Sequence, residues 1–152
     1  MKKALQLAKE AASEGEVPVG AVIVHHDMVV GVGRNRREKE KNALAHAELE
    51  AIDQACRSLG GWRLPECTLY VTLEPCPMCA GGIINSRIGR TVIALADAKS
   101  GCLGSVINFN TYPFNHKTKI EYGLCEGQAR EMMTEFFTRI RSKRNGKTEG
   151  EK

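Results

Sequence analysis

The sequence predicts one domain of the α/β class, layered around a single mixed sheet of five strands. Segments with helical and with strand-like patterns alternate along the chain, which is typical of helices packed against a sheet. The chain has 152 residues, which is enough for one domain with a full hydrophobic core. Its composition of 42% hydrophobic and 26% charged residues is ordinary for a globular protein.

The first predicted elements are a helix and a hairpin. Residues 2–14 carry apolar side chains at helical spacing, and Gly15 is expected to end the helix. Residues 19–24 are rich in Val and Ile and predict a buried strand, and residues 28–33 predict a second strand after a short turn. A polar and charged loop is expected at 34–42.

The middle of the chain continues the alternation. We expect a helix from His46 to Leu59, where two glycines end it, and a strand at 68–73. Pro77 suits the first turn of a helix that runs to about Ser86. Residues 91–95 predict the next strand.

The last third contains a long loop, a strand and a helix. Residues 97–117 are rich in Gly, Asn and Ser and predict a surface loop with at most one short helix. Residues 120–123 predict a fifth strand, and apolar side chains at helical spacing predict a final helix over 126–142. We expect residues 1–142 to form the single domain and residues 143–152 to be a basic, flexible tail.

Basic residues gather at two places in a chain that is mildly basic overall, with a net charge of +4. Such clusters can neutralise phosphates and so favour a nucleic-acid partner. For the last eight residues a solvated tail is the simpler interpretation. The clusters are Arg34, Arg36, Arg37, Lys39 and Lys41, and Arg139, Arg141, Lys143, Arg144 and Lys147.

Nothing in the sequence predicts a membrane-bound or exported protein. No stretch approaches the roughly 18 consecutive apolar residues of a membrane span, and polar residues interrupt the N-terminal segment where a signal peptide would be apolar. We therefore expect a cytoplasmic protein whose cysteines are mostly reduced. Its six cysteines are Cys56, Cys67, Cys76, Cys79, Cys102 and Cys125.

Chemistry is concentrated in two short motifs, His46-Ala47-Glu48 and Pro75-Cys76-Pro77-Met78-Cys79. One imidazole and two thiolates fill three of the four tetrahedral positions of Zn²⁺ and leave the fourth for water. Zinc can lower the pKa of that water from about 15.7 to about 7. The motifs therefore predict one Zn²⁺ ion per chain, with His46, Cys76 and Cys79 as its ligands, and leave the carboxylate of Glu48 free to move protons.

Other interpretations of these residues stay open. The Cys-x-x-Cys pair can be a redox pair, because a helix N-terminus lowers the pKa of a thiol. It can also be half of a structural zinc site, with Cys67 or Cys102 as a fourth ligand. A zinc-stabilised RNA-binding module and a deaminase of free nucleobases or nucleosides are two further alternatives.

Longer stretches of the sequence resemble one family. The zinc pattern alone is that of the wider cytidine-deaminase-like zinc deaminases. The flanking segments narrow the resemblance to the bacterial tRNA-specific adenosine deaminases, from about residue 4 to about residue 142. These segments are Glu16–Val22, Tyr70–Gly81, Ser86–Ile88, Asp97–Gly101, Asn115-His116 and Phe136-Phe137.

The resemblance implies a three-layer α/β/α fold of the cytidine-deaminase-like type and a homodimer. It implies a hydrolase that converts adenosine to inosine at the wobble position of a tRNA anticodon stem-loop, typically of an arginine tRNA. It also implies substrate-binding roles for five further residues. These are Asn35, Asp97, Asn115, Phe137 and Arg141.

Helical periodicity and the family pattern disagree about the catalytic carboxylate. Residues two apart on an ideal helix point about 200° apart, so a helix that includes His46 would place Glu50, not Glu48, on the face of the ligand. A side chain in the first turn can, however, bend around the helix end. We follow the family pattern, in which hydroxide attacks C6 of adenine and Glu48 transfers the protons.

Overall fold

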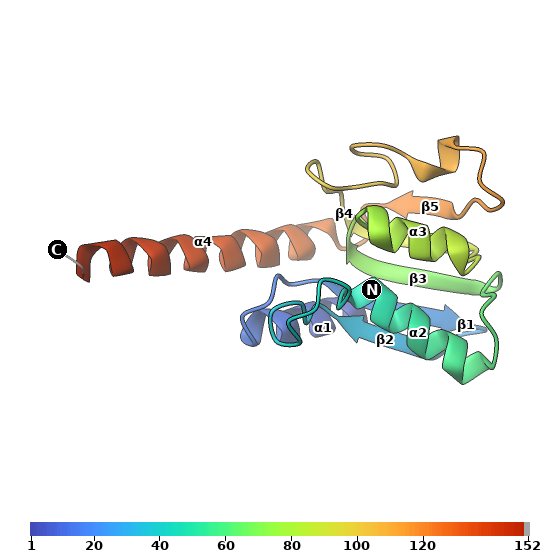
Figure 1. The fold of residues 1–152 in the computed structure, drawn as a ribbon, viewed down its shortest axis with the longest axis horizontal. Coiled ribbons are helices and arrows are strands. Elements are labelled where there is room, and N and C mark those ends of the chain that lie inside the picture. Colours follow the sequence, from blue (N-terminus) through green and yellow to red (C-terminus); the bar gives the residue numbers. More distant parts are fainter. Residues whose placement is uncertain (151–152) are drawn as a thin grey trace.

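The computed structural model describes residues 1–150 and has the predicted order of elements (Figure 1). Every predicted helix and strand is present with ends that agree within one residue, apart from the end of the last helix. The strands are β1 (Gly20–His25), β2 (Met28–Arg34), β3 (Cys67–Leu73), β4 (Arg90–Leu95) and β5 (Lys119–Tyr122). The helices are α1 (Lys2–Ser13), α2 (Ala47–Leu59), α3 (Pro77–Asn85), the 3₁₀ helix η1 (Phe109–Thr111) and α4 (Glu126–Gly150).

The strands form one mixed sheet in the order β2-β1-β3-β4-β5. Strand β1 pairs antiparallel with β2 and β3, whereas β4 runs parallel to β3 and β5. A short turn joins β1 to β2, which requires an antiparallel pair, and α3 connects β3 to β4, which allows a parallel one. The prediction of a mixed five-stranded sheet is confirmed.

Helices cover both faces of this sheet (Figure 1). Ala51 of α2 and Ile83 of α3 pack against Leu69 of β3 in one hydrophobic core. Leu5 of α1 and Ala129 of α4 belong to a second core on the other face. The three-layer α/β/α fold is therefore confirmed. Among the described helices, none combines the length and the apolar character that a membrane crossing requires.

Close packing of α2 on the hairpin determines where this helix starts. A Cβ atom built at Gly33 would lie 2.1 Å from the carbonyl oxygen of Ala47, and one at Gly31 would lie 2.2 Å from that of Ala51. Only glycine leaves room for the helix backbone at these two positions of β2. The first turn of α2, directly after His46, is therefore held against the sheet.

The last helix is longer than predicted. Helix α4 continues without a break to Gly150 and projects beyond the body of the molecule (Figure 1). The segment after Ser142 contains Lys and Arg, which favour helix, and no proline. The hydroxyl of Ser142 donates back to the carbonyl of Thr138 (3.1 Å), within the helix. The expected end of the helix at 142 is wrong for residues 143–150, residues 151–152 lie outside the described part, and the division into a domain and a flexible tail stays a prediction.

Candidate active site

Two of the predicted metal ligands stand directly before helices. His46 is the N-cap residue of α2 and has an extended backbone, with φ −92° and ψ 148°. Cys76 is the N-cap residue of α3, with φ −71° and ψ 177°, and Cys79 lies in the first turn, after Pro77 at the first helical position. Because α2 and α3 lie side by side on one face of the sheet, the starts of both helices meet (Figure 1).

The three side chains converge on one point. His46 Nδ1 lies 3.7 Å from Cys76 Sγ and 3.5 Å from Cys79 Sγ. All three ligand atoms lie within 4.8 Å of one another. A tetrahedral zinc ion with bonds of about 2.0–2.3 Å places its ligand atoms roughly 3.5 Å apart. Both these distances and the donor set of one imidazole and two thiols fit a zinc ion.

Hydrogen bonds among these three side chains shift the pKa of each of them. The pKa of Cys76 is lowered to about 4, chiefly because the Cys79 thiol donates a hydrogen bond to it. The pKa of Cys79 is raised because Cys76 holds its proton and because the thiol is buried. The pKa of His46 is raised by its hydrogen bond to Cys76. One thiolate therefore forms readily and a second is resisted, and a bound cation would relieve this resistance.

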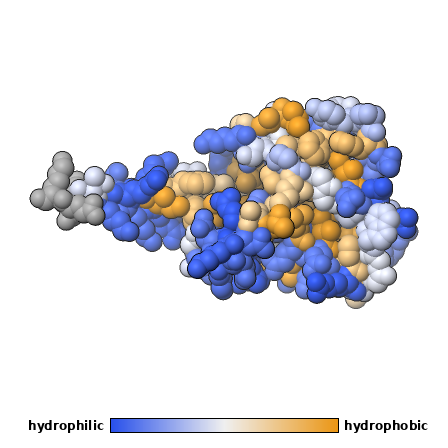
Figure 2. Space-filling model, in the orientation of Figure 1, coloured by the Kyte–Doolittle hydropathy of each residue, from blue (hydrophilic) through white to orange (hydrophobic). Residues whose placement is uncertain are grey.

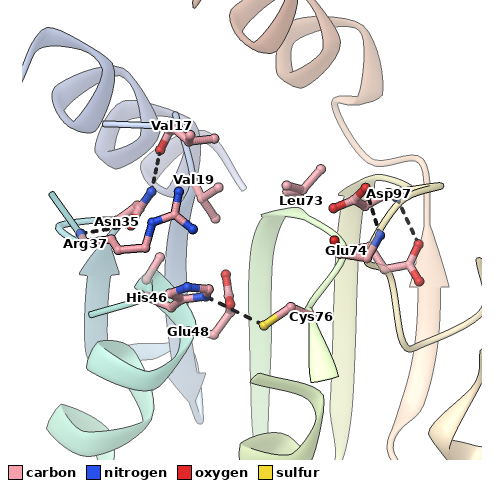
Figure 3. A pocket seen from close by; sticks show the side chains of 12 residues that line it. Val17, Val19, Asn35, Arg37, His46, Glu48, Leu73, Glu74, Cys76 and Asp97 are labelled. Carbon is pink, nitrogen blue, oxygen red and sulfur yellow. Dashed lines mark hydrogen bonds between the residues drawn. The ribbon is translucent and has the colours of Figure 1, made fainter. Parts of the chain in front are cut away.

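Glu48 is buried beside these ligands. Only 3% of it is exposed, and it lines the same cavity as His46 and Cys76. Figure 3 shows its side chain next to the His46 ring, on the side that faces Cys76. Burial raises the pKa of Glu48 to about 7, with Cys79 and His46 acting in the opposite direction. At neutral pH this carboxyl group can therefore both accept and donate a proton.

Glu50 is directed elsewhere. Its carboxylate forms an ion pair with Arg36 (3.1 Å) and accepts a hydrogen bond from the backbone N–H of Arg34 (3.4 Å). Because His46 precedes α2 and has an extended backbone, the angular spacing of an ideal helix does not apply to His46 and Glu48. The structure thus places Glu48 at the cavity, and its catalytic role stays a prediction.

A cavity of about 170 Å³ adjoins the ligands. In Figure 3, Asn35 and Arg37 lie on one side of it and Leu73 and Asp97 on the other. His46, together with Glu48 and Cys76, lies between these two sides.

Two of the predicted substrate-binding residues are held rigidly in this cavity. The side-chain N–H of Asn35 donates to the carbonyl of Val17 (3.2 Å), and its Oδ1 accepts a hydrogen bond from the backbone N–H of Arg37 (3.2 Å). Asp97 Oδ1 accepts a hydrogen bond from the backbone N–H of Lys99 (3.0 Å). Asn35 and Asp97 are therefore brought together with the predicted metal ligands and Glu48.

Comparisons with known proteins agree with this geometry. A family model described as MafB19-like deaminase matches residues 1–141. The chain is 44% identical over 145 residues to the tRNA-specific adenosine deaminase of Bacillus subtilis (strain 168), covering 95% of this chain and 90% of the relative. It is 43% identical over 143 residues to the protein of the same name from Aquifex aeolicus (strain VF5), covering 93% of this chain and 94% of the relative.

The chain belongs to the family of tRNA-specific adenosine deaminases. A solved structure from a study of A-to-I editing by tRNA:A34 deaminases superposes with a TM-score of 0.84 at 40% identity, and covers 87% of this chain and 96% of that chain. The protein is therefore an enzyme, a deaminase, and has the cytidine-deaminase-like fold.

The other predicted contacts of the deaminase lie away from the cavity. Asn115 lines a separate hollow on the surface with Phe109 and Phe114. Phe137, which is 41% exposed, and Arg141 lie on the outer part of α4. A ligand in the cavity would have to extend across the surface to reach these three predicted residues.

The structure does not supply a fourth cysteine ligand. Among the described residues, the group around His46 contains only Cys76 and Cys79 as thiols. Cys67 and Cys102 are each 2% exposed, and burial raises the pKa of both thiols. The alternative of a structural zinc site completed by either cysteine is therefore not supported.

The basic cluster near residue 37 is partly neutralised within the chain. Arg34 pairs with Glu14 (2.9 Å), and Arg36 pairs with Glu50 (3.1 Å). Arg37 differs because it lines the cavity. From this cluster, Arg37 is therefore the side chain placed to meet a ligand in the cavity.

Sequence reasoning did not single out two buried carboxylates near the cavity, Glu16 and Glu74. They are 1% and 2% exposed. Both lie in segments that resemble the family, and each precedes an apolar or proline residue next to a buried strand. For Glu74 the available signal was a charged residue directly after a buried strand, since buried carboxylates need hydrogen-bond partners. Glu16 follows the polar residues 13–15 and gave no such local signal.

Proposed function

We propose that this deaminase converts adenosine to inosine at the wobble position of a tRNA anticodon loop, with one zinc ion per chain. The observation that carries the proposal is the His46–Cys76–Cys79 group beside the buried carboxylate of Glu48, in one cavity. The names of the relatives from Bacillus subtilis and Aquifex aeolicus support the tRNA substrate. The solved relative, from work on the wobble position, supports the site of reaction.

His46 Nδ1 and the thiolates of Cys76 and Cys79 would hold the zinc ion. When bound, zinc lowers the pKa of a water molecule from about 15.7 to about 7 and so supplies a nucleophile at neutral pH. The overall reaction consumes one water molecule, replaces the amino group at C6 of adenine by oxygen, and releases ammonia.

Glu48 would transfer the protons of this reaction. Because it lines the cavity beside His46 and Cys76, its carboxylate can accept the proton of the attacking water and pass it to ring nitrogen N1. The same carboxylate would then take the remaining proton from the hydroxyl group added at C6 and give it to the amino group, which leaves as ammonia while the C6 carbonyl forms. Because Glu48 is buried, few water molecules compete for these protons.

Asn35 would orient the nucleoside. Its amide nitrogen and its oxygen each make one hydrogen bond within the chain, to Val17 and Arg37. An amide has two donors and two acceptor sites, so one of each stays available for a ligand. The two internal bonds hold the side chain in one orientation at the side of the cavity (Figure 3).

The projecting part of α4 supports an RNA substrate. Figure 2 shows that this part of the molecule is largely hydrophilic. Exposed basic side chains attract phosphates, and a base leaves its stack most easily in a single-stranded loop. The exposed basic residues of this helix include Arg139, Arg141, Lys143, Arg144 and Lys147.

We further propose a homodimer that acts in the cytoplasm on an arginine tRNA. Exposed apolar side chains of the segment 106–114 support a protein interface. They are Val106, Ile107, Tyr112 and Phe114. Light scattering, compared with the chain mass of 16.7 kDa, tests the dimer.

The central test is an inosine assay on synthetic anticodon stem-loops. Stem-loops of an arginine tRNA and of other tRNAs, each with adenosine at the wobble position, are compared with free adenosine and free adenine. We expect inosine in the arginine stem-loop and no reaction of the free compounds. Ammonia release from free nucleosides or bases alone would contradict the proposal and favour the alternative, a small-molecule deaminase.

Metal analysis tests the zinc site separately. We expect about one zinc ion per chain, because three protein ligands are present. Cys79→Ala is expected to lose the zinc, whereas Cys102→Ala, a change of another buried cysteine, is expected to keep it. Full activity without zinc, or with iron in its place, would contradict the proposed chemistry.

A further inference from the structure

Two loops form opposite sides of the cavity. One side includes Asn35 and Arg37, which follow β2, and the other includes Asp97 and Ser100, which follow β4. Neither pair belongs to a helix or a strand, so no ladder of regular hydrogen bonds holds these residues in place. Figure 3 shows the two sides facing each other, with Glu74 next to Asp97.

The carboxylate of Glu74 accepts hydrogen bonds that hold the loop after β4 in place. Its Oε1 accepts a hydrogen bond from the backbone N–H of Asp97 (3.0 Å). Its Oε2 accepts hydrogen bonds from the backbone N–H groups of Leu103 (3.1 Å) and Ser105 (3.1 Å), and the Ser105 hydroxyl also donates to Oε1. Four donors of one loop therefore share a single carboxylate, whose charge strengthens each bond.

The loop fits tightly around this carboxylate. A Cβ atom built at Gly101 would lie 2.2 Å from the carboxyl carbon of Glu74, so only glycine fits there. The backbone N–H of Cys102 donates to the carbonyl of Pro75 (3.0 Å). The loop is thus joined to the same turn that carries the metal ligand Cys76.

The carboxylate of Glu16 holds the loop after β2 in the same way. Its Oε1 accepts a hydrogen bond from the backbone N–H of Lys39 (2.8 Å), and its Oε2 accepts one from that of Glu38 (3.2 Å). These two residues follow Arg37, whose own backbone N–H donates to Asn35 Oδ1 (3.2 Å). A buried carboxylate therefore supports each side of the cavity, and that of Glu74 also lines it.

We propose that Glu16 and Glu74 are positioning residues that hold the two loops in the conformation that binds the nucleoside. The inference rests on the proposed function of this cavity. A buried charge is unfavourable unless it is well hydrogen-bonded, so these carboxylates serve the loops rather than the hydrophobic core. His46, Glu48 and Cys79 lie at helix starts, outside both loops. Loss of either carboxylate should therefore weaken substrate binding more than it slows the chemical step.

Hydrogen exchange tests the anchors without any substrate. Glu74→Gln keeps the shape of the side chain, but its amide nitrogen cannot accept a bond from an N–H group. We expect faster exchange of the backbone amides in residues 97–105 and no change elsewhere. Glu16→Gln is expected to speed exchange at residues 38–39 only. Unchanged exchange in these segments, or an equal rise throughout the core, would overturn the proposal.

Steady-state kinetics on the anticodon stem-loop tests the consequence. We expect KM to rise about tenfold in each variant and kcat to change by less than about threefold, as for the loss of a binding interaction. Zinc content and the pH profile should not change. The control is Glu121→Gln, since that carboxylate pairs with Arg90 (2.6 Å) on the outer strand β5, and it should leave KM unaltered.

Three kinetic outcomes would overturn the proposal. They are a fall in kcat at constant KM, a shifted pH profile, and an equal rise in KM for Glu121→Gln. If Glu74→Gln does not fold, Ser105→Ala removes one of the four donors and should speed exchange in the same segment. If the unaltered enzyme does not deaminate the stem-loop, the proposed function fails, while the exchange comparison still decides whether the carboxylates anchor the loops.

Discussion

The backbone conformation of a single residue, His46, determines which carboxylate faces the predicted metal ligands. His46 is the N-cap residue of α2 and has an extended backbone, so helical geometry does not fix the direction of its side chain. Glu48, in the first turn, is then buried beside the imidazole, whereas Glu50 pairs with Arg36.

Replacing each carboxylate in turn separates their roles. Glu48→Gln is expected to keep zinc and the fold and to slow single-turnover inosine formation by at least roughly 10²–10⁴-fold, the range for a positioned general acid–base. Glu50→Gln removes a partly exposed ion pair and should change the rate only slightly. A slow Glu50→Gln variant beside an active Glu48→Gln variant would show that Glu50 is the proton carrier.

At the scale of elements, α2 is positioned by its contact with β2. The Cβ atom that alanine would add at Gly33 meets the backbone of Ala47, one residue after His46. The backbone cannot yield there without moving the first turn of α2. Packing of this helix therefore determines where His46 and Glu48 lie.

Gly33→Ala is expected to lower the free energy of unfolding by roughly 1–3 kcal/mol, as overpacking does, and to reduce zinc affinity. Gly127→Ala is the matched control, since a Cβ atom at Gly127 in α4 meets nothing within 4 Å. It should raise the free energy of unfolding by up to about 1 kcal/mol, because alanine favours helix over glycine. Urea denaturation measures both, and a Gly33→Ala variant as stable as the parent would contradict the packing argument.

Helix α4 is the element that we expect to contact the RNA backbone. Arg141→Ala should weaken stem-loop binding and reduce the slope of log affinity against log salt by roughly one unit for each lost phosphate contact. Arg130→Ala on the same helix is the control, because Arg130 pairs with Glu126 (2.6 Å). Equal slopes for Arg141→Ala and the parent would place the RNA elsewhere.

At the scale of the whole molecule, helix α4 extends further along the chain than the hydrophobic core does. Phe136 is the last buried hydrophobic residue along the chain among those described, and residues 143–148 are exposed. Stability and zinc binding should therefore depend on residues 1–142, and the rest of α4 should serve binding.

A chain that ends at Ser142 is expected to keep its zinc and to melt within a few degrees of the full chain, because the side chains described beyond that point, those of residues 143–148, are all exposed. Its affinity for the stem-loop should fall and depend less on salt, since four basic residues, Lys143, Arg144, Lys147 and Lys152, are removed against only two glutamates. Calorimetry and binding titrations at two salt concentrations measure both. A large loss of stability would show that the domain extends past 142.

Local patterns in the sequence determined the helices and strands and the three residues that we predict as metal ligands. Each helix and strand follows from spacing within one segment, and that spacing does not depend on distant residues. His46, Cys76 and Cys79 were recognisable because zinc demands particular donor atoms, whatever the fold around them. The outward part of α4 was missed because it carries no apolar pattern and mixes helix-favouring Lys and Arg with Asn and Gly, which do not favour helix.

Only the tertiary structure decided which charged side chains face the cavity. Glu74 binds N–H groups 23 and 31 residues further along the chain, and Arg34 pairs with a residue 20 positions earlier. Spacing within one segment cannot reveal such pairs. Helical periodicity alone favoured Glu50 and the family pattern favoured Glu48, and only the structure shows the physical reason, which is the extended backbone of His46 where the chain enters α2. Burial and long-range hydrogen bonds, which exist only once the layers have packed, therefore determine the electrostatics of the site.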